Sequence, residues 1–323
     1  MKKFSEIIDY YYKELYPIVK ELDKKREAVK QRTFLRFGAI VLLTSFALLV
    51  FVKQSENVDF LNLVIFYAAF MTVVYGVVLS FTSKDYVAEF KQRVIKPLIG
   101  FIDPSLRYTV NAYIPQHLFT KSKIVTSRID RYSGNDYVAG VVDGVKIEFS
   151  DVHAEQKHTD SKGRTHYETL FQGMFLRAEF PKHFHGRTVV LPDSAEKMFG
   201  SFLGKMLQSY NFSRAELVKM DNPEFEKHFV VYGTDQIESR YILSHSMMER
   251  ILTFRKKVGH DISLSFVGGE MFVAVHYNKD TLEPAIYSSL LDYKIAKEYI
   301  ETLFFAMGVV EELQLNQKLW SKR

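Results

Sequence analysis

Two long stretches almost without charge dominate the hydropathy pattern near the N-terminus. Residues 33–52 contain a single charge, Arg36, close to their start, and residues 60–81 contain none. A helix rises 1.5 Å per residue, so about 20 residues span roughly 30 Å, the hydrocarbon thickness of a bilayer. We therefore predict two membrane-spanning helices, which the short connection 53–59 makes into a hairpin.

A signal peptide followed by a buried core helix is the alternative interpretation. A signal peptide places its apolar core within the first 15–30 residues. Here the first apolar stretch begins near residue 33, and no small-residue cleavage site follows it. A core helix also rarely runs for 22 residues without a polar face, as residues 60–81 do. The pattern therefore favours two spans.

Basic residues predict the orientation of the hairpin. Residues 20–36 carry seven lysines and arginines and residues 82–96 carry four, whereas the connection carries only Lys53. Because basic residues accumulate on the cytoplasmic side, both termini are expected in the cytoplasm and the connection outside. The expected location is the bacterial inner (cytoplasmic) membrane, where anionic lipids would attract the basic flank.

Composition and charge narrow the possible functions. The chain of 323 residues has no cysteine, which excludes disulfides, thiolate metal sites, iron–sulfur clusters and a cysteine nucleophile. The formal net charge is +5, but residues 82–323 carry 32 basic and 30 acidic side chains, so the excess lies beside the predicted membrane. Nucleic-acid binding needs a basic face on the binding domain, so no nucleic-acid partner is expected.

Amphipathic helices are predicted on both sides of the hairpin and at the C-terminus. Residues 1–32 form the first, with a kink at Pro17. Residues 82–119 form a juxtamembrane helix and linker, and residues 288–323 a long final helix. The N-terminal helix has two possible uses: its apolar stripe packs on the rest of the protein, or it contacts the membrane surface or a partner helix. The stripe recurs at spacings of three and four, at Phe4, Ile8, Tyr11, Leu15, Ile18 and Leu22.

The remaining segment, 120–287, has the pattern of a cytoplasmic α+β domain. Asp143-Gly144 and Gly268-Gly269 each separate two strand-like runs, which is typical of hairpins. A polar loop is expected at 157–168, and helices at 194–210 and 235–257. Because no βαβ alternation is present, the sheet is expected to be mostly antiparallel. The predicted fold class is α+β: a two-helix transmembrane hairpin with amphipathic flanking helices and a cytoplasmic, mostly antiparallel α+β domain.

A stripe of small residues runs along the second predicted span. Ala68, Thr72, Gly76 and Ser80 recur every four residues, and small residues at this spacing let another helix approach closely. The partner is either the first span or a helix of a neighbouring subunit. Both spans lack internal charge, which ion pumps and proton relays usually need.

One group of side chains has metal-ligand chemistry. Asp151, His153 and Glu155 alternate along a predicted strand and so share a face, and His158 or His166 would extend the set. The alternative is a solvated strand face beside a polar loop. No HExxH pattern occurs.

Asp235 and Glu238 have the spacing of a capping box at a helix start. We expect them to serve the helix that follows, and a catalytic role is the alternative.

Four segments carry a resemblance to a known family: 137–140, 145–155, 170–175 and, most clearly, 225–243 (FEKHFVVYGTDQIESRYIL). They resemble one uncharacterised bacterial family of two-span membrane proteins that carry a domain of unknown function. The resemblance covers about 120–290 together with the hairpin, and it implies this topology but no activity, ligand or catalytic residue.

The sequence contains no nucleotide-binding or nucleophile-elbow motif. We therefore expect a membrane-anchored, non-enzymatic protein that self-associates into a homo-oligomeric assembly or scaffold, with no cofactor and the lipid bilayer as partner. The alternatives are a metal-dependent enzyme at the membrane surface, using the Asp151 group, and a pore or transport subunit.

Overall fold

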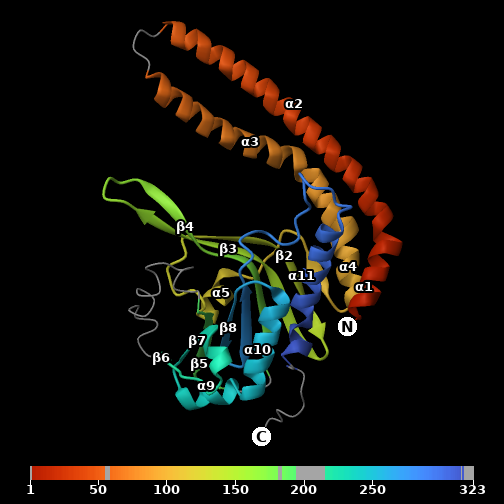
Figure 1. The fold of residues 1–323 in the computed structure, drawn as a ribbon, viewed down its shortest axis with the longest axis vertical. Helices are drawn as coiled ribbons and strands as arrows, with labels where there is room; N and C mark the ends of the chain where they lie inside the picture. The colour runs from red at the N-terminus through yellow and green to blue at the C-terminus, as the bar shows by residue number, and fades with distance from the viewer. Residues whose placement is uncertain (1, 55–58, 181–183, 194–214, 314, 316–323) are drawn as a thin grey trace. The chain divides into compact units, whose positions relative to one another are not determined.

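The structure is a computed structural model that describes residues 2–54, 59–180, 184–193, 215–313 and 315 (Figure 1). The chain forms two compact units. The helical unit comprises residues 8–97 and 283–297, and the sheet unit comprises residues 1–7, 98–282 and 298–323. Each unit is described by itself below.

Two long helices form most of the helical unit. α2 spans Tyr16–Gln54 and α3 spans Phe60–Phe90, and the two run antiparallel as neighbours (Figure 1). Asp59 caps α3, because its carboxylate accepts the amide of Asn62. The shorter helical segments before α2 and after α3 are α1 (Phe4–Tyr10), η1 (Tyr11–Leu15), η2 (Lys91–Ile95) and α4 (Lys96–Ile102).

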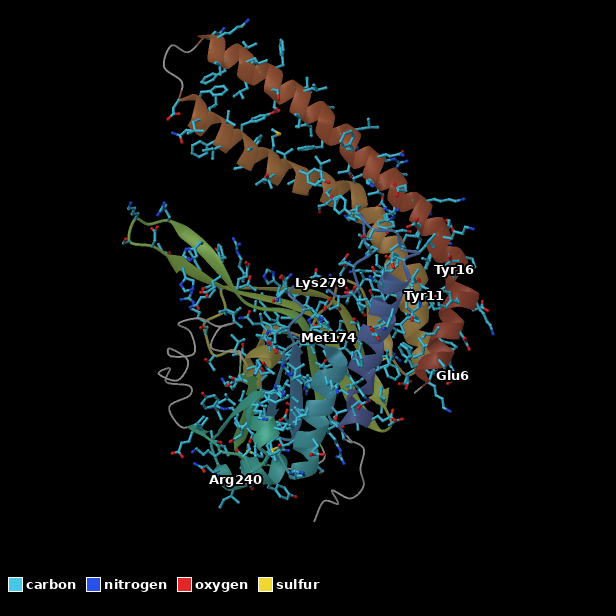
Figure 2. The ribbon with its side chains drawn as sticks, in the orientation of Figure 1. Glu6, Tyr11, Tyr16, Met174, Arg240 and Lys279 are labelled. Carbon is cyan, nitrogen blue, oxygen red and sulfur yellow. The ribbon has the colours of Figure 1, made fainter. Side chains whose placement is uncertain are left out.

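Both η1 and η2 are five-residue π-turns that end just before a proline. In η1 the amide of Tyr16 donates to the carbonyl of Tyr11, and Pro17 follows; Figure 2 labels these two tyrosines. In η2 the amide of Lys96 donates to the carbonyl of Lys91, and Pro97 follows. Proline lacks an N–H and its ring clashes with the carbonyl four residues earlier, so a wider turn accommodates it without ending the helix. At Pro17, where the sequence predicted a kink, the π-turn η1 accommodates the proline.

The sheet unit is built on a nine-stranded sheet in which all neighbouring strands are antiparallel. The strand order is β1-β2-β3-β4-β9-β8-β5-β7-β6. With the two long helices, this sheet confirms the predicted α+β class. The strands are β1 (Arg107–Thr109), β2 (Arg131–Val142), β3 (Val145–Thr159), β4 (Thr165–Glu179), β5 (Arg187–Pro192), β6 (Glu216–Leu217), β7 (Phe229–Gly233), β8 (Ile262–Val267) and β9 (Glu270–Val275).

Helices cover both faces of the sheet. On one face, Phe119 of α5 (Gln116–Ser122) packs on Phe171 and Phe175 of β4, with ring centroids 5.4 and 4.8 Å apart. On the other face lie α10 (His245–Val258) and α11 (Tyr293–Glu312) (Figure 1). Their Phe254 and Phe305 line a small pocket together with Met174 and Leu176, the next side chains along β4. Successive side chains of β4 and β9 point to opposite faces of the sheet. Both faces are therefore apolar, and helices pack on each of them. Two short helices, α8 (Pro223–Glu226) and α9 (Gln236–Ile242), complete the described part.

Both predicted hairpin turns are present. Asp143 and Gly144 have φ of 49° and 84°, and Gly268 and Gly269 have φ of 61° and 79°. Two consecutive positive φ angles are what a tight two-residue hairpin requires. β2–β3 and β8–β9 pair across these turns, as the sequence predicted.

Four sequence predictions differ from the described structure or lie outside it. The region 157–168 is not a loop, because β3 and β4 extend to Thr159 and Thr165 around a turn closed by Asp160. The region 235–257 forms two helices, because Leu243 leaves helical geometry (φ −88°, ψ 58°) before Ser244 starts α10. The last helix begins at Tyr293, after the carboxylate of Asp292 accepts the amide of Lys294. The predicted helix 194–210 lies outside the described residues.

Candidate functional site

The apolar parts of α2 and α3 are exposed, not buried as a soluble core would be. Leu42 is 74% exposed, Phe46 69% and Phe66 73%. These two helices are long and apolar enough to cross a membrane by length and composition. Exposed apolar surface of this extent is costly in water. This exposure separates them from core helices of a soluble protein that have the same composition.

Polar groups on this pair of helices bond between the helices. The hydroxyl of Tyr67 on α3 lies 2.8 Å from both Thr44 Oγ1 and Ser45 Oγ on α2. Phe37 and Tyr75 meet edge to face, with ring centroids 5.0 Å apart. In an apolar medium such hydroxyls need protein partners, so these contacts suit a helix pair in lipid.

The small-residue stripe lies on the outer side of α3. Ala68, Thr72, Gly76 and Ser80 are all exposed, whereas Met71, four residues after Tyr67, is buried. A Cβ built on Gly76 would have nothing within 4 Å. The face of α3 that meets α2 is therefore the one carrying Tyr67 and Met71, and the stripe is left without a partner within the described chain.

A network of charges holds the polar ends of the two helices together. Glu89 of α3 accepts from Lys25 of α2 at 2.6 Å and from Arg93 at 2.6 Å, and Arg93 also donates to Glu21 at 2.7 Å. The hydrogen bond from Arg93, helped by Lys25, lowers the pKa of Glu21 to about 2. Charges alternate in sign across the network, so this end of the pair is held by polar contacts where the apolar part ends.

A non-helical segment, 283–292, crosses this polar end, and we call it the strap. Asp23 of α2 accepts from the amide of Leu290 at 2.8 Å and from the hydroxyl of Ser289 at 3.1 Å. Arg26, only 4% exposed, donates to Asp23 at 2.8 Å and to the carbonyl of Ile286 at 3.1 Å.

The strap also bonds to α3 and η2. Tyr86 donates to the carbonyl of Ala285 at 2.9 Å, and the hydroxyls of Tyr75 and Tyr287 bond to each other. Glu283 pairs with Lys91, whose side chain is 2% exposed. The buried cations and tyrosine of this site, Arg26, Tyr86 and Lys91, thus all bind a segment 192 to 260 residues later in the sequence.

The structure places the predicted metal-ligand group on β3, and one member, Asp151, is hydrogen-bonded to Thr281. Asp151 is 2% exposed, and both its oxygens accept from Thr281. His153 Nε2 lies 3.3 Å from Thr169 Oγ1 and 4.0 Å from Glu155 Oε1. Among the residues that the structure describes, no three His, Asp or Glu side chains gather closely enough to hold a metal ion. The metal site at Asp151, His153 and Glu155 stays a prediction, which elemental analysis of wild type and of His153→Ala can test.

The two histidines that would extend this group lie further along the same hairpin. The rings of His158 and His166 stack across the strand pair, with centroids 5.4 Å apart, and His158 Nε2 lies 2.8 Å from Glu168 Oε2. They pair with each other near the turn and so are separated along the strands from Asp151.

Of the two residues predicted to form a capping box, Asp235 caps the helix, whereas the side chain of Glu238 bonds elsewhere. Asp235 caps α9, accepting the amides of Ile237 and Glu238 at 2.8 and 2.9 Å. The carboxylate of Glu238 accepts the amides of His185 and Gly186 at 2.8 and 2.6 Å, and so fixes the start of β5. Both residues therefore have structural partners in the fold.

Sequence reasoning missed the residues that hold the strap. Asp23, Arg26 and Lys91 were counted only as flanking charges of the predicted spans. One signal was available: Arg26 and Lys91 fall on the same helical periodicity as apolar residues, Arg26 between Leu22 and Val29. A charge on an apolar stripe requires a buried partner, but the sequence does not identify it.

Comparisons with known proteins identify a domain of unknown function. No curated protein sequence matches the chain. One solved structure that is similar is described as "crystal structure of the mycobacterial trehalose monomycolate transport factor A, TtfA". The identity is 9% and the TM-score 0.35, and the alignment covers 64% of this chain and 89% of that one. The family model that matches residues 169–315 is described as "Protein of unknown function (DUF3137)". This match confirms the resemblance to an uncharacterised family, and the C-terminal region of the chain carries a DUF3137 domain of unknown function.

Proposed function

We propose that this protein is a membrane-anchored, non-enzymatic protein that self-associates into a homo-oligomeric scaffold at the cytoplasmic face of a bacterial inner membrane. The observation that carries the proposal is the exposed small-residue stripe on a helix whose other face already contacts α2. The sequence supports the non-enzymatic part, because it contains none of the motifs tested above.

Membrane anchoring follows from the cost of the alternative. Burying apolar surface is worth roughly 25 cal/mol per Å². Leu42, Leu43, Phe46, Phe66 and Phe81 are each 69–77% exposed, so water would face a continuous apolar surface along both helices. A bilayer removes this cost, and the hydroxyls of Thr44, Ser45 and Tyr67 are already bonded within the pair.

Self-association follows from the shape of the outer face of α3. Lipid tails are as apolar as leucine, so helices in a bilayer associate chiefly through close packing of small residues. The stripe is a shallow strip along α3, flanked by bulky side chains such as Val73 and Val77, which are 66% and 50% exposed. A second copy of α3 presents the same surface and would fit it about a two-fold axis.

The test compares two matched substitutions on α3. Ala68→Leu fills the stripe, whereas Ala69→Leu adds the same atoms to an exposed position 100° around the helix. Gly76→Leu is a second stripe variant, and the space around Gly76 in the protomer accommodates it. The mass of the protein particle would be measured by light scattering in detergent. The proximity of two copies of α3 would be measured by crosslinking in vesicles.

We expect the wild type and Ala69→Leu to be oligomers, and Ala68→Leu and Gly76→Leu to shift toward monomer. A monomeric wild type in both settings would overturn self-association. An oligomer unchanged by both stripe variants would show that the contact lies elsewhere and would overturn the role of the stripe.

A further inference from the structure

The strap carries a run without charge that is unusual for a connection beside a charged network. Residues 284–291 read PAIYSSLL, and the next residues are Asp292, Tyr293 and Lys294. Tyr287 and Tyr293 are each 57% exposed and Leu291 is 36% exposed. The exposed residues of this region are therefore Tyr287, Leu291 and Tyr293 together with the polar Ser288, Asp292 and Lys294.

The strap lies beside the apolar part of α3. The hydroxyl of Tyr287 bonds to that of Tyr75, which lies six residues inside the uncharged stretch 60–81. At 1.5 Å per residue, Tyr75 is about 9 Å from the end of this stretch. If α3 crosses a bilayer, Tyr287 reaches the depth at which headgroups meet acyl chains.

The backbone of the strap is suited to that depth. Irregular backbone is tolerated in a membrane only where its polar groups have protein partners. The carbonyl of Ala285 accepts from Tyr86, that of Ile286 from Arg26, and the amide of Leu290 donates to Asp23. Side chains of the helix pair thus satisfy these three peptide groups, and Tyr287 and Leu291 remain exposed, whereas Leu290 is buried.

The C-terminal end of the strap combines tyrosine with exposed charges of both signs, Asp292 and Lys294. Tyrosines are enriched where membrane meets water, because the ring is apolar and the hydroxyl is polar. Lys294 and Lys297, both exposed, follow within one helical turn of Tyr293 and lie where anionic headgroups would be.

We propose that the strap and the start of α11 dock on the lipid bilayer: Tyr287 and Leu291 of the strap and Tyr293, the first residue of α11, insert into the cytoplasmic headgroup region. This inference rests on the proposed membrane anchoring. It makes the strap a second membrane contact besides the spans instead of a cytoplasmic linker.

The test uses tryptophan as a depth probe in the full chain. The sequence has one tryptophan, Trp320, so Trp320→Phe supplies a background without tryptophan. In that background we would prepare the two strap variants, Tyr287→Trp within the strap and Tyr293→Trp directly after it. Tyr241→Trp on α9 is the matched control, since Tyr241 is 60% exposed against 57% for Tyr287 and Tyr293. Phe46→Trp, on the apolar part of α2, reports the span itself.

Fluorescence would be compared between vesicles of ordinary phosphatidylcholine and of phosphatidylcholine brominated on the acyl chains near the headgroup. We expect quenching of Phe46→Trp and of both strap variants, and none of Tyr241→Trp. Strap variants that behave like Tyr241→Trp while Phe46→Trp is quenched would overturn this inference and leave the anchoring intact. An unquenched Phe46→Trp would overturn both.

Discussion

The carboxylate of Asp151 on β3 binds both polar groups of Thr281, the backbone amide and the hydroxyl. The carboxylate accepts the backbone amide of Thr281 at 2.5 Å and its hydroxyl at 2.9 Å, across 130 residues of sequence. The side chain is almost fully buried, and this burial raises the pKa of Asp151 from 3.8 to about 7, with Asp136 adding to the rise and the amide of Thr281 opposing it. Thr281 lies two residues before Glu283, so this contact fixes the chain just ahead of the strap.

The raised pKa of Asp151 predicts a pH-dependent stability. The folded state retains a proton on Asp151 between about pH 4 and pH 7, where the unfolded chain has lost it. This contribution to the free energy of unfolding is therefore full below about pH 4 and is lost as the pH rises toward 7, by up to roughly 4 kcal/mol. Asp151→Asn keeps an acceptor for the amide of Thr281 but does not ionise. We expect the variant to gain stability relative to wild type between pH 5 and pH 8, measured as the difference in apparent Tm. Parallel pH curves for the two proteins would contradict the assignment.

Two glycines predict opposite outcomes for the same substitution. A Cβ at Gly134 on β2 would lie 2.2 Å from the carbonyl oxygen of Asp151 and 2.8 Å from Tyr113 Cβ, and the backbone atom cannot give way. Gly100 on α4 has nothing within 4 Å of its Cβ. We expect Gly134→Ala to lower the apparent Tm strongly or to prevent folding. We expect Gly100→Ala to keep or raise the apparent Tm, because alanine favours a helix over glycine by about 1 kcal/mol. Equal effects of the two changes would show that β2 and β3 do not approach as described.

The pair formed by Lys91 and Glu283 predicts how firmly the strap is held. Lys91 is 2% exposed, so its ammonium depends on its protein partners. Glu283→Gln removes the opposite charge; because Glu283 itself is 34% exposed, the expected cost lies between about 1 kcal/mol for a surface pair and about 3 kcal/mol for a fully buried one. Glu21→Gln is the control, because Glu21 is 48% exposed and such surface pairs contribute at most about 1 kcal/mol.

We expect Glu283→Gln to lower the apparent Tm in detergent and to speed tryptic cleavage after Lys294, with little change for Glu21→Gln. Unchanged cleavage in Glu283→Gln would indicate that the other strap contacts suffice to hold the segment.

Topology can be tested on a chain that has no cysteine of its own. Lys53→Cys places a thiol at the outer end of α2, and Ser161→Cys places one at the exposed turn between β3 and β4. The basic flanks predict that an impermeant maleimide labels Lys53→Cys in intact spheroplasts, and Ser161→Cys only after permeabilisation. Labelling of Ser161→Cys in intact spheroplasts would reverse the predicted orientation.

Patterns close together in the sequence predicted the local structure. The two apolar runs predicted α2 and α3 because a helix long enough for a bilayer is defined by consecutive residues. The turns at Asp143-Gly144 and Gly268-Gly269 predicted β2–β3 and β8–β9, since positive φ angles restrict which residues fit. Together these signals were enough for the α+β class.

What only the tertiary structure decided depends on residues far apart in the chain. The sequence contains the stripe at Ala68 and Gly76, but which side of α3 meets α2 depends on how Tyr67 and Met71 pack across the pair. Arg26 and Asp151 look like surface charges in the sequence, but each also bonds to a residue more than 100 positions later, Arg26 to Ile286 and Asp151 to Thr281. A local pattern specifies an element because it repeats over a few residues, whereas a buried charge is specified by a partner that no local pattern contains.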